Sequence, residues 1–191
     1  MEIRSFLAFE LPSEIKDIVS QVAGALEGSP IDLRQVKAEN IHLTVVFLGS
    51  VREKDIPAIC NEAQGVCTRY SSFNVSLEGA GVFGSRNSPR VLWIGLNGDI
   101  DRMSHFRDAL QKELLPFGIK QETRRFRPHL TLGRFRKGYQ PDAHLDKFLS
   151  GYRDLTSPAR PLVELVLFRS DLKPGGAVYT KMDSWPLSGK R

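Results

Sequence analysis

Two short stretches decide the fold: HLTVVFLG at residues 42–49 and HLTLGR at residues 129–134, one in each half of the chain. In a β-strand, alternate side chains share a face, so the histidine and threonine of each stretch point the same way while the leucine between them points to the other side. The repeat therefore predicts two strands that each present an imidazole and a hydroxyl to one surface, His42 with Thr44 and His129 with Thr131.

The segments around the two stretches follow one order, strand, helix, strand, helix, strand. Ser13, the predicted N-cap of the first helix, precedes His42 by 29 residues, and Asp99, predicted to cap the helix of the second half, precedes His129 by 30. The remaining expectations are strands at 3–9, 41–48, 73–82, 91–96, 129–135, 163–168 and 177–184 and helices at 52–70 and 142–149.

This spacing predicts an internally duplicated α+β fold that is bilobal, with antiparallel sheets around a central cleft. We expect a single domain over residues 1–191, made of two pseudo-symmetric lobes that carry the motifs at 42–45 and 129–132. The turn-rich segment GVFGSRNSPRV at residues 81–91, which includes Arg86, is the predicted boundary between the halves.

Composition favours an ordinary globular chain, because 41% of the 191 residues are hydrophobic and 26% are charged. No apolar run approaches the roughly 20 residues that cross a bilayer, and the first residues carry Glu2 and Glu10 without a signal-peptide pattern. We therefore expect a cytoplasmic monomer with no membrane partner.

Positive charge is concentrated in one segment of a chain whose net charge is +5. Residues 120–137 hold seven basic residues opposed within that segment only by Glu122, and such a cluster attracts phosphate groups. Its members are Lys120, Arg124, Arg125, Arg127, Arg134, Arg136 and Lys137.

Two facing imidazoles suit a reaction that removes a proton on one side of an atom and donates one on the other. The ordinary pKa of histidine, about 6.5, allows one ring to be neutral while the other is protonated. Phosphoryl transfer has this requirement, since an attacking water loses a proton as the leaving alkoxide gains one. Thr44 and Thr131 can donate to the nonbridging phosphate oxygens. The sequence thus predicts His42 and His129 as the catalytic pair.

Arg134 is the candidate cation for the developing negative charge, although it lies five residues after His129 and strict alternation would turn it to the other face. Gly133 offers the solution, because a glycine inside a strand often marks a bulge that redirects the next side chain. The other two histidines, His105 and His144, fall in predicted helices without a following threonine. No Asp, Glu or Cys near the two motifs completes a ligand set, so we expect no metal.

The motifs HLTVVFLG and HLTLGR resemble those of the 2H phosphoesterase superfamily. The likeness extends to RSFLAFELP at 4–12 and PRVLWIGL at 89–96, which are similar to the bacterial and archaeal RNA 2',3'-cyclic phosphodiesterases once called 2'-5' RNA ligases. The resemblance implies hydrolysis of an RNA 2',3'-cyclic phosphate end to a 2'-phosphate, without a cofactor.

The resemblance also implies a role for each site residue. It makes His42 the proton donor to the leaving 3'-oxygen and His129 the base that activates water, with Thr44, Thr131 and Arg134 as phosphate ligands.

Two other interpretations stay open. The same site can catalyse formation of a 2'-5' RNA linkage, with a 5'-hydroxyl in place of water, or open another cyclic nucleotide. From a different class of protein, the chain can be a catalytically silent module that binds RNA ends through its basic cluster.

Overall fold

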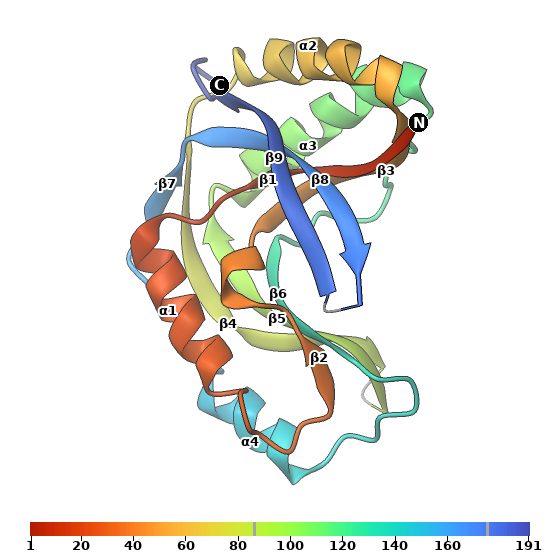
Figure 1. The fold of residues 1–191 in the computed structure, drawn as a ribbon. Helices are drawn as coiled ribbons and strands as arrows, with labels where there is room; N and C mark the ends of the chain where they lie inside the picture. The colour runs from red at the N-terminus through yellow and green to blue at the C-terminus, as the bar shows by residue number, and fades with distance from the viewer. Residues whose placement is uncertain (86, 175) are drawn as a thin grey trace.

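The computed structural model describes residues 1–85, 87–174 and 176–191. In these residues, nine strands form one antiparallel sheet, in which neighbouring strands are often not consecutive in the chain, and four α-helices pack around it (Figure 1). The strands are β1 (Glu2–Phe9), β2 (Leu33–Gln35), β3 (Leu43–Arg52), β4 (Phe73–Ser85), β5 (Ser88–Gly98), β6 (His129–Phe135), β7 (Arg160–Leu162), β8 (Glu164–Lys173) and β9 (Gly176–Pro186). The helices are α1 (Ser13–Gly24), α2 (Ile56–Cys67), α3 (Ile100–Leu114) and α4 (Ala143–Gly151).

The sheet is narrowest at its centre, between β3 and β6. Its strand order is β7-β4-β5-β6-β3-β1-β8-β9, and β2 adds to β6. β3 and β6 pair at one position only, Leu43 opposite Leu130, and both leucines are fully buried. The two halves of the sheet therefore meet at the middle residues of the two His-Leu-Thr motifs.

Each half of the sheet contains strands from both halves of the chain, since β4 pairs with β5 and β8 pairs with β1. At the predicted boundary, β4 and β5 pair as a hairpin up to Ser85 opposite Ser88. Arg86 of the boundary segment lies outside the described residues.

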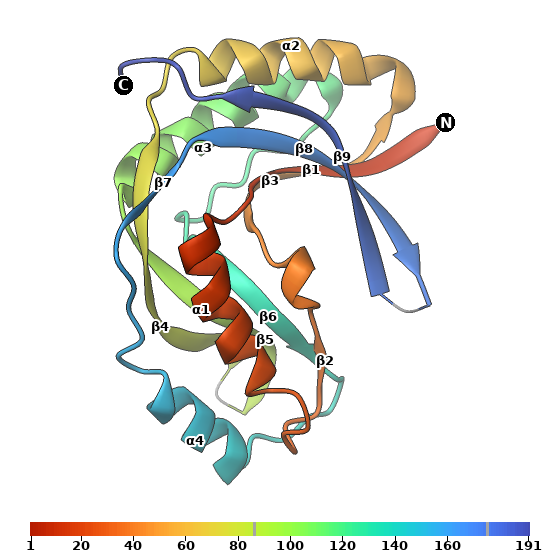
Figure 2. The same ribbon diagram turned by 60° about the vertical axis from the view of Figure 1, so that its left-hand side comes forward.

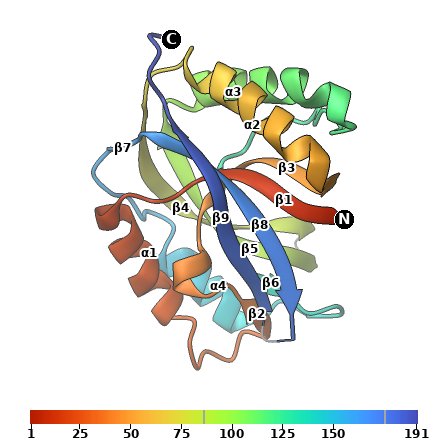
Figure 3. The same ribbon diagram turned by 45° about the horizontal axis from the view of Figure 1, so that its top comes forward.

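The helices gather at two ends of the molecule. α2 and α3 lie side by side over one end of the sheet, and α1 and α4 lie at the opposite end (Figures 1 and 3). Beneath α3, the rings of Phe9, Phe73 and Phe106 form an aromatic cluster in which the centroids of Phe73 and Phe106 lie 5.3 Å apart. This packing fixes β1, which pairs with β3, and β4, which pairs with β5 on the far side from β6. Every helix in the described parts of the chain is too short or too polar to cross a lipid bilayer.

Past Arg169, β8 pairs only with β9, so that the ends of these strands form a two-stranded ribbon (Figure 2). A side-chain hydrogen bond holds the ribbon against the rest of the protein. Asn40, at the end of a short 3-10 helix (Ala38–Asn40) that leads into β3, donates its side-chain amide to the carbonyl of Ala177 at 3.2 Å. The ribbon is thereby held against the segment that carries His42.

The expected strands and helices are all present; β6 has the expected bounds, and the ends of most others are shifted. Two local expectations were wrong. Ser13 is the first helical residue and its hydroxyl donates to Glu14, while Pro12 occupies the N-cap position without a side-chain bond. The helix expected at 52–70 is shortened to Ile56–Cys67, preceded by one 3-10 turn. β2 and β7 were not expected, because a three-residue strand is too short to show a periodic pattern.

Candidate active site

The two His-Leu-Thr motifs run antiparallel past each other at the centre of the sheet. Because Leu43 and Leu130 point into the core, alternation turns His42, Thr44, His129 and Thr131 to the opposite surface, where all four are half-buried. We call this surface the histidine face. The antiparallel register sets His42 on the Thr131 side of the leucine pair and Thr44 on the His129 side.

Both imidazoles are held by the same backbone contact. His42 Nδ1 lies 2.8 Å from the carbonyl oxygen of Asn40, and His129 Nδ1 lies 2.8 Å from the carbonyl oxygen of Arg127. A carbonyl oxygen only accepts, so Nδ1 of each ring must carry the proton and donate it. Nε2 is consequently the nitrogen that each ring offers for chemistry, as a base when the ring is neutral and as an acid when it is protonated.

The two rings differ in what their Nε2 atoms contact. Nε2 of His42 lies 3.0 Å from the hydroxyl of Thr44. The hydroxyl donates when the ring is neutral and accepts when the ring is protonated, so the contact persists through both states. No matching bond from His129 to Thr131 occurs among the described residues, which leaves Nε2 of His129 ready for a water molecule or a substrate.

Aromatic side chains orient both imidazoles. The ring of His42 stacks on Phe6 with centroids 4.7 Å apart and an interplanar angle of 21°, and Tyr179 of β9 packs edge-on against it at 5.2 Å. His129 is packed edge-on by Phe83 of β4 at 4.7 Å. These neighbours are far from the two motifs in the sequence, and no local pattern indicates them.

Burial lowers the pKa of both histidines below the ordinary value of 6.5. The hydrogen bonds to the carbonyls of Asn40 and Arg127 oppose this effect, and nearby positive charge adds to it: His129 lowers the pKa of His42, and Arg134 lowers that of His129. The charge of each of these groups thus affects the protonation of its neighbour, His129 that of His42 and Arg134 that of His129.

A bulge in β6 turns Arg134 toward the histidine face. Trp93 of β5 pairs with Thr131, whereas the preceding Leu92 pairs with Gly133, so β6 contains one extra residue between them. The bulge predicted at Gly133 is therefore present. A Cβ atom at Gly133 would lie 2.1 Å from Leu33 Cδ1 and 3.0 Å from the backbone oxygen of Arg34, so any other residue there would displace Leu33. Past the bulge, exposed Arg134 regains the side of Thr131.

A cavity of about 470 Å³ opens beside His129. Trp93 forms part of its wall, and its ring lies against Gly81, where a Cβ atom would come within 2.4 Å of Cζ2. Aromatic side chains, which can stack on a nucleobase, line the cavity together with basic and acidic ones. The aromatic residues are Phe83, Trp93 and Phe126, the basic ones Arg125 and Arg127, and the acidic ones Glu78 and Asp101.

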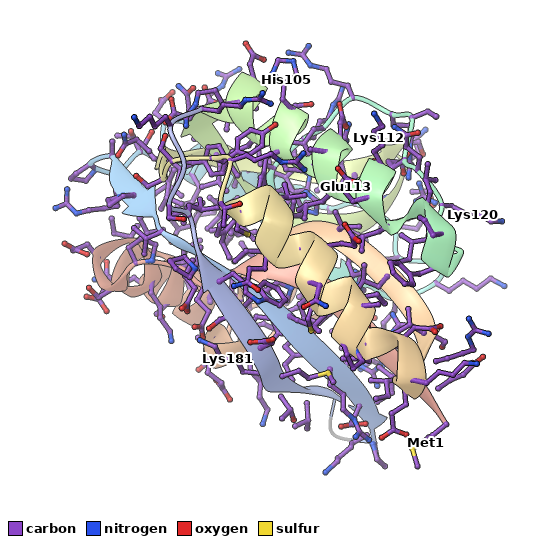
Figure 4. All side chains as sticks on the ribbon, turned by 90° about the horizontal axis from the view of Figure 1, so that it is seen from above. Met1, His105, Lys112, Glu113, Lys120 and Lys181 are labelled. Atoms are coloured by element: carbon purple, nitrogen blue, oxygen red, sulfur yellow. The ribbon has the colours of Figure 1, made fainter. Side chains whose placement is uncertain are left out.

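Ion pairs neutralise part of the basic cluster. Arg124 pairs with Glu122, the acidic residue within the same segment, and Arg136 pairs at 3.0 Å with Asp32, which lies outside it. His105 and His144 are exposed on α3 and α4, away from the two motifs, and Figure 4 shows His105 on the outer side of α3.

Within the described ranges, no group of three or more histidine, cysteine or acidic side chains is arranged to hold a metal ion.

Known proteins resemble this chain along nearly its whole length. A family model described as LigT-like phosphoesterase matches twice, at residues 9–93 and 94–179. A protein of Methanothermobacter thermautotrophicus named RNA 2',3'-cyclic phosphodiesterase is 32% identical over 187 residues, which cover 98% of this chain and 100% of that protein.

Solved structures show the same fold. The Escherichia coli LigT structure with bound 3'-AMP matches with a TM-score of 0.75 and 26% identity, covering 98% of this chain and 99% of that one. A Thermus thermophilus protein matches with a TM-score of 0.82 and 24% identity, covering 99% and 100%.

Proposed function

Since this chain belongs to the LigT-like phosphoesterase family, we propose that it hydrolyses the 2',3'-cyclic phosphate at the end of an RNA to a 2'-phosphomonoester. The observation that carries the proposal is the paired Nδ1 bonds to the Asn40 and Arg127 carbonyls, which leave both Nε2 atoms available for proton transfer. The names of the relatives, RNA 2',3'-cyclic phosphodiesterase, support the choice of substrate.

The proposed reaction is one displacement at phosphorus. The unprotonated Nε2 of neutral His129 takes a proton from water. The water oxygen bonds to phosphorus as the P–O3' bond breaks. His42, protonated at Nε2, donates its proton to the departing 3'-oxygen, which leaves a 2'-phosphate and a free 3'-hydroxyl. Exchange with solvent then restores both rings. The family resemblance supports this assignment of donor and base.

Thr44, Thr131 and Arg134 are the proposed phosphate ligands. Their hydroxyl and guanidinium groups donate to the nonbridging oxygens, whose negative charge grows in the transition state. With two proton-transfer groups and a guanidinium in place, the proposed mechanism needs no metal and no cofactor. The single domain over residues 1–191, the cytoplasmic location and the monomeric state stay predictions.

The first test compares hydrolysis with its chief rival, formation of a 2'-5' linkage. A short RNA with a 2',3'-cyclic phosphate end is incubated with the enzyme, with and without a partner RNA that has a 5'-hydroxyl, and the product ends are identified. We expect the 2'-phosphate to predominate in both reactions and a strong chelator to leave the rate unchanged. Predominant joining of the two RNAs, or a rate that needs an added metal, would refute this assignment.

The pH dependence follows from the lowered histidine pKa values. Activity requires one neutral and one protonated imidazole, so kcat/KM falls at low pH as the base gains a proton and at high pH as the acid loses one. Because burial lowers both pKa values, both limbs move to lower pH, and we expect the maximum below pH 6.5. The check is a profile at constant ionic strength. A maximum on the alkaline side of 6.5 would contradict the shared environment of the two rings.

A further inference from the structure

β2, the short strand that the sequence did not reveal, places Arg34 directly opposite Arg134. Val91 of β5 pairs with Arg134 from the other edge of β6, so Arg134 lies between Val91 and Arg34. Side chains opposite each other in an antiparallel pair project from the same side of the sheet, with Cβ atoms roughly 5 Å apart. Arg34 therefore shares the histidine face with Arg134.

The neighbours of Arg34 in β2 confirm this orientation. Gln35 turns to the other side, where its Nε2 donates to the carbonyl of Ala23 at 2.6 Å. Leu33 packs over Gly133 on that same side, since its Cδ1 occupies the space that a Gly133 side chain would need. With Leu33 and Gln35 directed into the protein, Arg34 between them projects outward and is exposed.

The placement of Arg34 opposite Arg134 destabilises the unbound protein. Like charges directly opposite in an antiparallel pair destabilise it. In the part of the chain that the structure describes, neither the Arg34 nor the Arg134 guanidinium has a hydrogen-bond or ion-pair partner. Arg136, one residue past the end of β6, shows the ordinary arrangement, because Asp32 neutralises it at 3.0 Å. An anionic ligand would relieve the repulsion between the two unpaired guanidinium groups.

We propose that Arg34 forms a second phosphate site beside the catalytic one, which binds the phosphodiester on the 5' side of the terminal nucleotide. This inference rests on the proposed function, in which Arg134 binds the cyclic phosphate. A nucleotide whose 2' and 3' oxygens share one phosphate can carry another only at its 5' oxygen. The preferred substrate is therefore the end of an oligonucleotide, and a cyclic mononucleotide with a free 5'-hydroxyl is a poor one.

The test compares two substrates that differ by one phosphate: a nucleoside 2',3'-cyclic phosphate with a 5'-hydroxyl, and the same compound with a 5'-phosphate. We expect kcat/KM to be about tenfold higher with the 5'-phosphate, on the scale of one charge-assisted hydrogen bond. Arg34→Ala removes most of this preference, mainly through KM, and Arg34→Lys retains part of it.

Arg136→Ala is the matched control. It lowers the net charge by the same amount at a nearby position, but the guanidinium that it removes is paired with Asp32. It should keep the preference. The melting temperature of Arg34→Ala should not fall, since the substitution removes a like-charge contact.

Three results would overturn the second site: equal kcat/KM of the wild-type enzyme for both compounds, a retained preference in Arg34→Ala, or equal losses on both compounds with a lowered melting temperature. Failure of the wild-type enzyme to open either compound would instead overturn the proposed function on which the site rests.

Discussion

His42→Ala and His129→Ala each lower kcat on a cyclic-phosphate dinucleotide by roughly 10² to 10⁴, or about 3 to 5 kcal/mol in the barrier, the usual scale for a general acid or base. Each substitution removes the Nε2 atom of one proton-transferring histidine and leaves the other histidine in place. Because the two proton transfers belong to one displacement, the double variant should lose far less than the product of the two single losses.

The controls separate lost chemistry from lost structure. His42 stacks on Phe6 and both rings bond to the backbone, so each variant is compared with wild type by melting temperature as well as by rate. His105→Ala removes an exposed imidazole from α3 and should leave kcat unchanged. Near-wild-type turnover in either His42→Ala or His129→Ala would show that the two-histidine mechanism is wrong.

Arg134→Ala should reduce kcat/KM by about 2 to 4 kcal/mol, the scale of one lost transition-state donor. Arg134→Lys should recover only part of the loss, because lysine keeps the charge and lacks the planar fork that grips two phosphate oxygens. Arg134→Ala should also move the pH optimum upward, since the Arg134 charge contributes to the lowered pKa of His129. Steady-state kinetics across pH measure both effects.

Arg136→Ala is the comparison for Arg134 because both residues belong to the basic cluster, defined by the seven residues at 120–137. The Arg136 guanidinium is paired with Asp32, so its removal should weaken binding modestly and mainly at low salt, where long-range attraction is unscreened. Equal, small and salt-sensitive losses at both positions would mean that Arg134 only attracts the substrate at long range.

The sequence predicted the site where the pattern is local. β6 has the predicted bounds, His129 to Phe135, because its hydrophobic alternation and its bulge are both encoded within seven residues. Gly133 is itself a local signal of the bulge, because a glycine inside a strand indicates that another group approaches the backbone closely. Here that group is the Leu33 side chain. The direction of Arg134 could therefore be predicted before its neighbours were known.

The rest of the site depends on long-range pairing, which leaves no local pattern. Arg34 stands opposite Arg134 only because β2 joins β6, about a hundred residues away in the chain. Tyr179 reaches His42 because β9 pairs with β8 and Asn40 holds the ribbon in place. The carbonyls that fix the imidazole nitrogens depend on backbone geometry, which residue types do not specify.

The most direct test of the central claim is rapid mixing of excess enzyme with a dinucleotide that ends in a 2',3'-cyclic phosphate, in water enriched in the heavy oxygen isotope. Wild type should convert the substrate in a single turnover to the 2'-phosphate, with one heavy oxygen on phosphorus and no 3'-phosphate, and His42→Ala and His129→Ala should bind it with little conversion. Binding without conversion by wild type, or a 3'-phosphate product, would contradict the proposed hydrolysis by the two histidines.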